Sequence, residues 1–436
     1  MRTGLTTSLL ALALLAPHAY AEDDWGDDAW GDEEESGPAL HGFIEGAVGG
    51  RTSSDPALID DDQTLAELRA RLESETYLGD TRLSGKLDLY TDAADGGDNG
   101  LQLNLREAVA EFTLADNIDM RVGHQVLTWG TGDLLFLNDL FAKGWVSFFS
   151  GRDDEYLKAP STSVKWSVYG EDANLDFVWT PVFTHDEFIE GERFSYFSPL
   201  AAAQVSAPAG KVVPEEPSES FSNGEFAARL HGTTSLLGSN STEWALYGYR
   251  GFWKQPNAIN SSMQPYFSRL NVLGASLRTN VATGIGHTEF SWYNGADDAG
   301  NDPLVPNNQL RFLIGYEQEL IPKLTLGLQY YLEHIQDYDA LAANDGNSPY
   351  RPDENRSLWT MRLTYRAMQD NLTLSWFSFY SPTDQDYYHR PSAKYRFNDQ
   401  LSLTVGGNIF GGDQAHTFFG QFEDASNVYA RIRFSY

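Results

Sequence analysis

The sequence has no cysteine among its 436 residues, which excludes disulfide bonds, thiolate metal sites and cysteine nucleophiles. A chain without cysteine suits a protein that crosses the oxidising periplasm of a Gram-negative cell before it folds. Long apolar runs are also missing. After the first 21 residues no stretch reaches the roughly 20 apolar residues of a membrane-spanning helix, so we expect any membrane crossing to use strands.

The first 21 residues have the features of a secretory signal peptide. Arg2 supplies the positive charge, residues 9–16 form a short apolar stretch, and Ala19-Tyr20-Ala21 is an A-x-A cleavage site. We expect cleavage near Ala21. An uncleaved anchor is the alternative, although the apolar stretch is far too short to span a membrane. No cysteine stands at the cleavage point, which excludes a lipoprotein.

Residues 22–41 differ from the rest of the chain in composition. Nine of the first fifteen are acidic, and Trp25 and Trp30 each begin a Trp-Gly-Asp unit. Such a segment carries too little apolar surface to fold alone, so we expect a disordered acidic periplasmic tail. It is a solvated spacer, a plug whose carboxylates lie beside the lumen arginines, or a docking strip in which Trp25 and Trp30 contact a basic periplasmic partner.

The composition of residues 42–436 favours a transmembrane β-barrel. The whole chain holds 11 Trp, 22 Tyr, 25 Phe and 39 Gly, with a mean hydropathy of -0.40. In a membrane barrel only every second strand residue contacts lipid, so the average stays polar while aromatic girdles accumulate. A soluble sandwich or propeller could share this composition, but no blade period of about 40–50 residues is present.

Alternating apolar and polar residues mark eighteen strands, joined in turn by tight turns and by loops rich in Gly, Asp, Asn and Pro. Short periplasmic turns and long extracellular loops give outer-membrane barrels this asymmetry. We predict an all-β, closed antiparallel transmembrane barrel of about 18 strands (14–18), with long extracellular loops. The predicted strands are 42–51, 64–78, 81–90, 101–115, 117–127, 161–169, 173–183, 223–237, 241–253, 268–280, 283–294, 308–320, 322–336, 356–369, 370–381, 389–397, 400–410 and 427–436. Poor alternation in 101–115, 268–280 and 370–381 predicts bulges or misplaced strand ends there.

The last strand supports the same fold class. Residues 427–436 alternate apolar and polar, with Phe434 and the terminal Tyr436 on one face. Here the chain resembles Gram-negative outer-membrane proteins in general, whose final strand with a terminal aromatic is read by the barrel-assembly machinery. We expect the cell outer membrane as the location. We expect membrane lipid, lipopolysaccharide and the assembly machinery as partners, and no nucleic acid.

Charged residues divide unevenly between strands and loops. Most Lys and Arg lie in predicted strands, whereas most Asp and Glu lie in loops and the tail. A basic side chain facing lipid costs roughly 2–4 kcal/mol at mid-membrane, so we expect these side chains to face the lumen. They either pair with Glu67, Glu73, Asp88, Glu107 and Glu317 or leave a positive wall that favours anions. The predicted wall residues are Arg69, Arg71, Lys86, Arg106, Arg121, Lys165, Arg362, Arg366, Arg431 and Arg433, with Arg311, Lys394 and Arg396 beside them.

The segment 128–160 is the most distinctive part of the chain. It follows a strand that runs outward, yet it is strongly apolar and aromatic, which is unusual for a loop in water. We predict that it folds inward and narrows the channel; a cap over the barrel mouth is the alternative. The predicted pore-constriction residues are Asp133, Asn138, Asp139, Lys143, Arg152, Asp153 and Asp154.

One local pattern resembles a known family. The stretch GHQVLTWGTG (123–132), Asn138-Asp139, Arg152-Asp153 and the aromatic run 179–183 are similar to proteobacterial outer-membrane barrels that carry G-[RH]-Q-x-x-x-W-G. More loosely, the chain resembles monomeric 18-stranded substrate-selective porins of the alginate-export type. His124 stands where Arg is more usual. The resemblance implies a channel and names no cargo.

The pattern therefore predicts an outer-membrane channel for a small or amphipathic organic solute, with a transport partner in the periplasm or inner membrane. We expect no enzyme activity, no cofactor and no metal, because none of the nine His lies in a recognised catalytic or metal motif. A barrel enzyme needs a nucleophile or carboxylate near His, and His185-Asp186 is a lone loop dipeptide. That class and a structural or adhesin barrel remain as alternatives.

Overall fold

The computed structural model describes residues 39–59, 63–94, 100–236 and 240–436. The chain divides into two compact units, Met1–Gly37 and Pro38–Tyr436, and the second contains all the described structure. The predicted signal peptide and the tail tryptophans Trp25 and Trp30 lie outside the described residues. None of the helices in the described ranges is long and apolar enough to cross a membrane.

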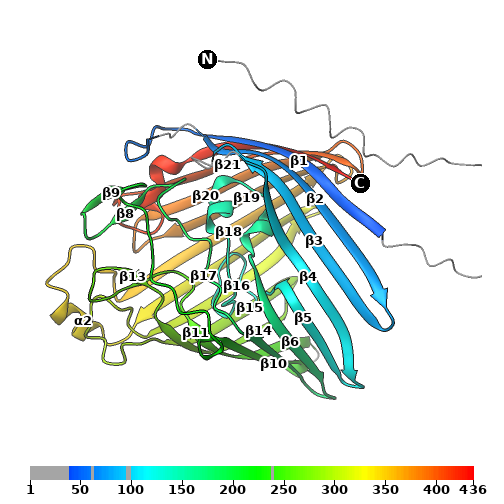
Figure 1. The fold of residues 1–436 in the computed structure, drawn as a ribbon, viewed down its shortest axis with the longest axis horizontal. Coiled ribbons are helices and arrows are strands. Elements are labelled where there is room, and N and C mark those ends of the chain that lie inside the picture. The colour runs from blue at the N-terminus through cyan, green and yellow to red at the C-terminus, as the bar shows by residue number, and fades with distance from the viewer. Residues whose placement is uncertain (1–38, 60–62, 95–99, 237–239) are drawn as a thin grey trace, which may run out of the picture. The chain divides into compact units, whose positions relative to one another are not determined.

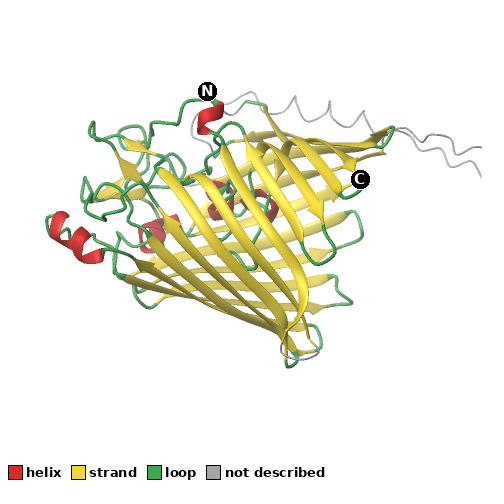
Figure 2. Cartoon of the chain, turned by 90° about the horizontal axis from the view of Figure 1, so that it is seen from below, coloured by secondary structure: helices red, strands yellow, loops and turns green. Residues whose placement is uncertain are grey.

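Eighteen strands form one closed antiparallel sheet (Figures 1 and 2). Each pairs with its neighbour along the chain, and β1 closes the barrel by pairing with β22, which confirms the predicted fold class. The strands are β1 (Ala39–Arg51), β2 (Gln63–Leu78), β3 (Thr81–Asp92), β4 (Gln102–Ala115), β5 (Ile118–Val126), β6 (Pro160–Tyr169), β7 (Asn174–Thr180), β10 (Glu225–Leu236), β11 (Asn240–Phe252), β14 (Arg269–Val281), β15 (Gly284–Asn294), β16 (Gln309–Ile321), β17 (Leu324–Ile335), β18 (Asn355–Ala367), β19 (Leu372–Ser381), β20 (Asp386–Arg396), β21 (Leu401–Gly412) and β22 (Asn427–Ser435).

Smaller elements decorate the connections. Two short hairpins lie outside the barrel sheet, and the helices are all brief. They are β8 (Tyr196–Ser198) with β9 (Ala203–Val205), β12 (Ala258–Ile259) with β13 (Pro265–Tyr266), the helices α1 (Trp145–Ser150) and α2 (Tyr338–Asn344), and the 3-10 turns η2 (Asp154–Leu157), η3 (Phe221–Asn223) and η4 (Gly420–Ala425).

The two faces of the wall follow from the alternation in the sequence. In β2, Arg69 and Arg71 are buried inside the barrel, while Leu68 and Leu72 are exposed on the outer face. In β22, Phe434 lies on the exposed face. Lipid on one side and polar groups on the other impose this period of two.

Three strand ends differ from the predicted ones by three residues: β1 starts at Ala39, within the predicted tail 22–41, β7 ends at Thr180 rather than at residue 183, and β20 starts early. This strand begins at Asp386 rather than at residue 389. The connection between β19 and β20 is therefore only residues 382–385, although it lies at the end of the barrel that carries the long loops. Tyr388 is buried in the lumen and Tyr387 is exposed, so the alternation extends back to Asp386. The Asp386 carboxylate accepts a hydrogen bond from the Phe419 N–H (2.7 Å), which holds the first residue of the strand.

One of three predicted irregularities is a bulge. In the β3–β4 ladder Lys86 pairs with Glu107 and Leu87 with Leu105, so Arg106 is the extra residue. The bulge turns the Arg106 side chain into the protein, where it is buried. The β14 and β19 ladders have no register shift, so 268–280 and 370–381 contain no bulge; a misplaced end, the other expectation, is confirmed at 370–381, where β19 begins at Leu372.

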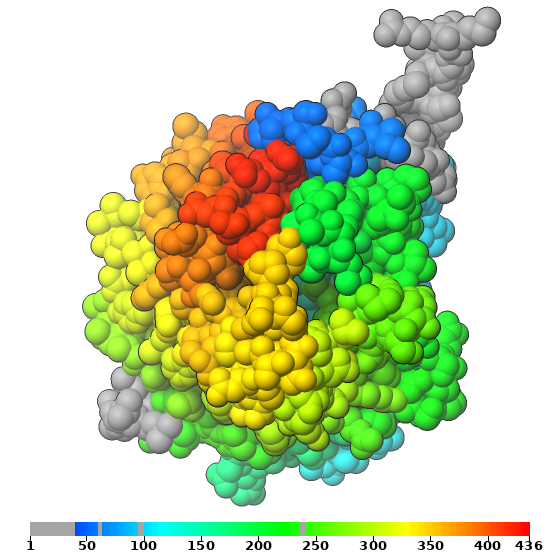
Figure 3. All heavy atoms as spheres, turned by 90° about the vertical axis from the view of Figure 1, so that its left-hand side faces the viewer, coloured from blue at the N-terminus to red at the C-terminus, as the bar shows by residue number. Residues whose placement is uncertain are grey.

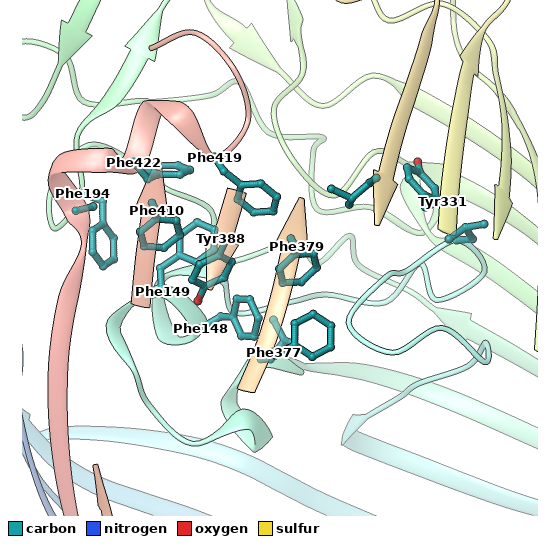
Figure 4. Packing of buried hydrophobic residues seen from close by; sticks show 14 of the residues in the cluster. Phe148, Phe149, Phe194, Tyr331, Phe377, Phe379, Tyr388, Phe410, Phe419 and Phe422 are labelled. Atoms are coloured by element: carbon teal, nitrogen blue, oxygen red, sulfur yellow. The ribbon is translucent and has the colours of Figure 1, made fainter. Parts of the chain in front are cut away.

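The two ends of the barrel are unlike. Tight turns lie at the end where β1 starts and β22 stops, and the long connections 127–159 and 181–224 belong to the other end (Figure 1). Figure 3 shows the loop-bearing end hollowed between the green loop 181–224 and the yellow loop 336–354. The largest cluster of buried apolar side chains lies inside the barrel, where α1 packs on β19 to β21 (Figure 4).

Candidate pore constriction and lumen wall

The segment 127–159 leaves β5 and turns into the lumen, as predicted. Phe148 and Phe149 of α1 are 3% and 2% exposed and pack edge-on against Tyr388, an inward-facing residue of β20 (Figure 4). The Asn408 side-chain amide of β21 donates a hydrogen bond to the Phe149 carbonyl (2.9 Å). The apolar character of this segment is thus satisfied by the barrel interior, because burial removes its aromatic rings from water.

Glu289 on β15 fixes the first part of the segment. Its carboxylate, 1% exposed, accepts hydrogen bonds from the Thr131 N–H and hydroxyl (2.9 Å for the latter), from the Gly132 N–H (2.8 Å) and from the Asn138 amide (2.7 Å). Gly130 has φ of 85°, and a Cβ there would lie 3.1 Å from the Glu289 carboxylate. Glycine at this position therefore lets two consecutive backbone N–H groups cradle the carboxylate.

Asp133 ties the next turn to two further strands. Its carboxylate forms an ion pair with both Nε and Nη2 of Arg362 on β18 (2.7 Å for Nη2). Its backbone N–H donates to Gln329 Oε1 on β17 (2.7 Å), and its carbonyl accepts from Gln329 Nε2 (2.9 Å). The two-point contacts with Arg362 and with Gln329 fix both the position and the orientation of Asp133.

The far end of the segment is held by ion pairs to other strands. Asp154 pairs with Arg390 of β20 (2.7 Å), whose guanidinium lies 3.9 Å from the Phe148 ring centre. Asp153 pairs with Arg431 and Arg433 of β22 (3.1 and 3.5 Å). These contacts fix the second half of the segment to β20 and β22, whereas the Glu289 contact fixes its first half to β15.

Arg152 is anchored in the same region. Its guanidinium pairs with Glu67 of β2 (2.8 Å) and with Asp92 of β3 (2.7 Å). Asp92 also pairs with Arg193 from the loop 181–224 (2.6 Å). Two extended loops therefore share one buried carboxylate of β3.

A buried charge network lies beneath η2. Asp88 of β3 is fully buried and accepts from Arg69 Nη1 (2.7 Å), from Arg71 Nε and Nη2 (2.6 and 2.9 Å) and from the Tyr156 hydroxyl (2.8 Å). Arg106, the bulge residue, donates to the carbonyls of residues 155 and 158 (3.1 and 2.9 Å). Pairing with Asp88 offsets the desolvation of the two β2 guanidiniums and fixes η2 to the wall.

A second buried group joins the segment to the loop 181–224. Lys143 pairs with Asp139 (2.9 Å), and both side chains are 5% exposed or less. Asp186 accepts from the Lys143 N–H (2.8 Å) and from Trp145 Nε1 (2.7 Å). Burial raises the pKa of Asp186 to about 6, against the opposing effect of Lys143 and these hydrogen bonds.

The seven predicted constriction residues all belong to this arrangement, in two groups. Asp133, Arg152, Asp153 and Asp154 make ion pairs with the barrel wall. Asn138, Asp139 and Lys143 are almost fully buried and bond within the segment or to β15. The sequence predicted that these side chains face a passage. In the structure the charged ones pair instead, because an unpaired charge among Phe and Leu side chains has a high free energy. A role of all seven in narrowing a passage stays a prediction.

The predicted wall cations differ in how far they are compensated. Arg69, Arg71, Arg362, Arg431 and Arg433 pair closely as described above. Lys165 pairs with Asp176 (3.3 Å), and Lys86 and Arg121 approach Glu107 and Glu111 at 3.9 and 3.5 Å. Arg366, Lys394 and Arg396 are exposed near the turn end, and no ion pair joins them to other described residues.

This uneven compensation leads to a prediction about ion selectivity. Replacing Arg366, Lys394 and Arg396 together by Gln is expected to lower the anion-to-cation permeability ratio about threefold or more. Each charge contributes roughly 0.4 kcal/mol to an ion 10 Å away in water before salt screening. Reversal potentials across a salt gradient measure the ratio. Lys323→Gln, in a turn beside β17, is the control and should leave the ratio unchanged; an unchanged ratio in the triple variant contradicts the prediction.

Several residues that position the segment were not singled out from the sequence: Glu289, Gln329, Arg390 and Asp186. Glu289 carries a weak signal, because it is a carboxylate in the middle of a predicted strand, where most charges are basic. Gln329 and Arg390 carry none, since their partners are distant in the sequence. His185 stacks on Phe267 (5.4 Å between ring centres), and its neighbour Asp186 bonds to the inward segment.

Comparison with known proteins adds evidence on the fold. No protein-family model matches the sequence, and no curated protein matches it. The chain is similar in structure to OccD3 (OpdP) of Pseudomonas aeruginosa, with 10% identity over 92% of this chain and 91% of that chain and a TM-score of 0.52. OccAB4 of Acinetobacter baumannii is 10% identical over 91% and 97%, with a TM-score of 0.52. OccK9 (OpdG) of Pseudomonas aeruginosa is 11% identical over 92% and 98%, with a TM-score of 0.51.

At this level of identity the likeness establishes the fold. The chain is a closed 18-stranded antiparallel β-barrel, which confirms the predicted fold class, and the outer-membrane location stays a prediction. The resemblance carried by the 123–132 motif and the alginate-export type stay predictions.

Proposed function

We propose that the protein is a passive outer-membrane channel for a small or amphipathic organic solute, and that segment 127–159 forms its constriction. One observation carries the proposal. A single continuous segment is fixed across the lumen, bonded to β15, β17 and β18 at its start and to β2, β3, β20 and β22 at its end.

The width of the barrel supports a transport role. Barrels of 16–18 strands leave an aqueous channel unless other parts of the chain fill it. Here the inward segment and part of the loop 181–224 occupy the lumen, and both are tied to the wall by many hydrogen bonds. Such anchoring suits a fixed constriction better than a mobile flap, because each buried pair resists displacement.

We also propose that the 123–132 motif is the anchor of this constriction. Trp129 packs edge-on against Phe141 (5.0 Å between ring centres), and Gly130, Thr131 and Gly132 form the turn that cradles Glu289. A motif of this kind fixes a loop to a wall and performs no chemistry, which favours a channel over an enzyme.

The proposal includes a transport partner in the periplasm or the inner membrane. The tail 22–41, with Trp25 and Trp30, has the charge and aromatic residues to dock a basic periplasmic protein or an inner-membrane exporter component. The proposal rests on the composition of the tail.

Deletion of residues 134–149 tests the channel. The intact protein is expected to conduct in small steps in planar bilayers, and the deletion is expected to raise the conductance severalfold, because the aromatic filling of the lumen is removed. Deletion of 338–344, the helix α2 in an outer loop, is the matched control and should leave the conductance unchanged. If the barrel conducts in neither form, the channel proposal is contradicted and the enzyme or structural class is favoured.

A further inference from the structure

A cavity of about 390 Å³ lies between the inward segment and the wall. One side is formed by the stretch 134–149, and the other by the outer ends of β11, β14, β15, β16, β17, β18 and β19, with Phe418 and Phe419 at the edge. In Figure 4, Tyr331 of β17 lies apart from the aromatic group around Tyr388, on another part of the wall. Binding sites for small organic molecules usually measure about 300–1,000 Å³.

The lining toward the inward segment is apolar. Leu134, Leu135, Phe136, Leu140 and Trp145 border the cavity, and each remains partly exposed to it. Leaving apolar surface in contact with water costs roughly 25 cal/mol per Å², so an apolar ligand gains this free energy when it displaces the water. Apolar side chains collected at one concave site are typical of ligand sites.

The charges around the cavity are compensated. Each of the four cations that border it forms an ion pair, so none offers a free positive charge to an anion. Asp186 also borders the cavity and adds a fifth carboxylate. Transfer of an anion into such a site loses hydration without a new counter-ion, and among the described lining residues a cation meets only Asp186, whose carboxylate already accepts hydrogen bonds from the Lys143 N–H and Trp145 Nε1. The four pairs are Lys143–Asp139 (2.9 Å), Lys254–Glu225 (2.6 Å), Arg311–Glu333 (3.2 Å) and Arg356–Asp384 (2.5 Å).

We propose that this cavity is a binding site for an uncharged hydrophobic organic molecule with one or two rings or an equivalent alkyl body, and that it discriminates against anions of the same skeleton. The inference rests on the proposed channel function and specifies its solute. A hydrophobic molecule entering from outside reaches this site at the outer strand ends, before it reaches the turn end of the barrel. The exposed wall cations near the turn end, Arg366, Lys394 and Arg396, then act on ions that pass through the barrel and not on this ligand.

Three probes with one skeleton test the proposal: 3-phenyl-1-propanol, 3-phenylpropanoate and 3-phenylpropylammonium. Calorimetric titration of the full-length barrel in detergent, with the detergent titration subtracted, gives the three affinities. The alcohol is expected to bind at least tenfold more tightly than either ion. Equal or tighter binding of the propanoate or the ammonium ion overturns the proposal, and so does the absence of alcohol binding.

Two variants sharpen the test. Glu333→Gln leaves Arg311 without its carboxylate, so the propanoate affinity is expected to rise about tenfold while the alcohol affinity stays the same. Leu135→Trp fills the cavity and should abolish alcohol binding. Glu219→Gln, the same change at an exposed loop position, is the control. An unchanged propanoate affinity in Glu333→Gln contradicts the charge argument.

The same preparation separates this inference from the channel proposal. Conductance without alcohol binding refutes the site and leaves the channel. Alcohol binding to a barrel that never conducts refutes the channel and leaves the site as a plain binding function.

Discussion

Replacing Glu289 by Ala is expected to raise the single-channel conductance severalfold and to increase the current noise. The substitution removes the acceptor of four hydrogen bonds and leaves the N–H groups of Thr131 and Gly132 buried without partners. Each such group costs roughly 1–3 kcal/mol, which is enough to release the turn from the wall. The barrel itself should persist, because the ladders of β15 with β14 and β16 use backbone groups. Recordings in planar bilayers measure the effect.

The matched control is Glu317→Ala on the neighbouring strand β16. Glu317 is an exposed lumen carboxylate, so its loss changes the charge of the lumen in the same way without touching the inward segment. If both variants raise the conductance equally, the effect comes from charge and the anchoring role of Glu289 is contradicted.

Replacing Asp88 by Ala is expected to lower the stability of the folded barrel by about 3–5 kcal/mol, the cost of leaving a buried charge without its partner. Arg69 and Arg71 are both nearly fully buried and both pair with Asp88, and Tyr156 donates to the same carboxylate. The change therefore also loosens η2. Denaturant-induced unfolding in detergent, followed by the gel shift of the heat-modifiable form, measures the loss.

Asp116→Ala provides the reference for this substitution. Asp116 lies in an exposed turn between β4 and β5, so its replacement should change stability by less than about 0.5 kcal/mol. A similar small loss for Asp88→Ala would mean that Arg69 and Arg71 find other acceptors, such as Glu67 and Glu155.

On the proposed channel function, the arrangement of the lumen would make a barrel of this width selective. Its filling consists of one segment attached on both sides: its first part bonds to β15, β17 and β18, and its helix α1 packs on β19 to β21. Because both parts are anchored, the remaining spaces have a fixed shape. Fixed spaces bordered by apolar side chains select solutes by size and polarity, as small-molecule sites do.

Much of the fold is determined by the sequence alone. In β2 the alternation of Leu68 and Leu72 with Arg69 and Arg71 separates a lipid face from a lumen face before any tertiary contact is known. The reason is local, because lipid and water lie on opposite sides of every strand and impose a period of two. The apolar character of 128–160 likewise requires an interior, which the barrel provides.

Only the tertiary structure decided which side chains pair with one another in the lumen. Thr131 meets Glu289 across 158 positions, and Asp133 meets Arg362 across 229. Residues that the sequence marks as charged and inward-facing, such as Lys143 and Asp139, become buried partners of one another instead of facing a passage. No periodicity encodes the Thr131–Glu289 and Asp133–Arg362 contacts, because they depend on which strands the folded segment reaches; Lys143 and Asp139 are close in sequence, but their burial depends on the same fold. The desolvation of a charge then requires a partner at that place.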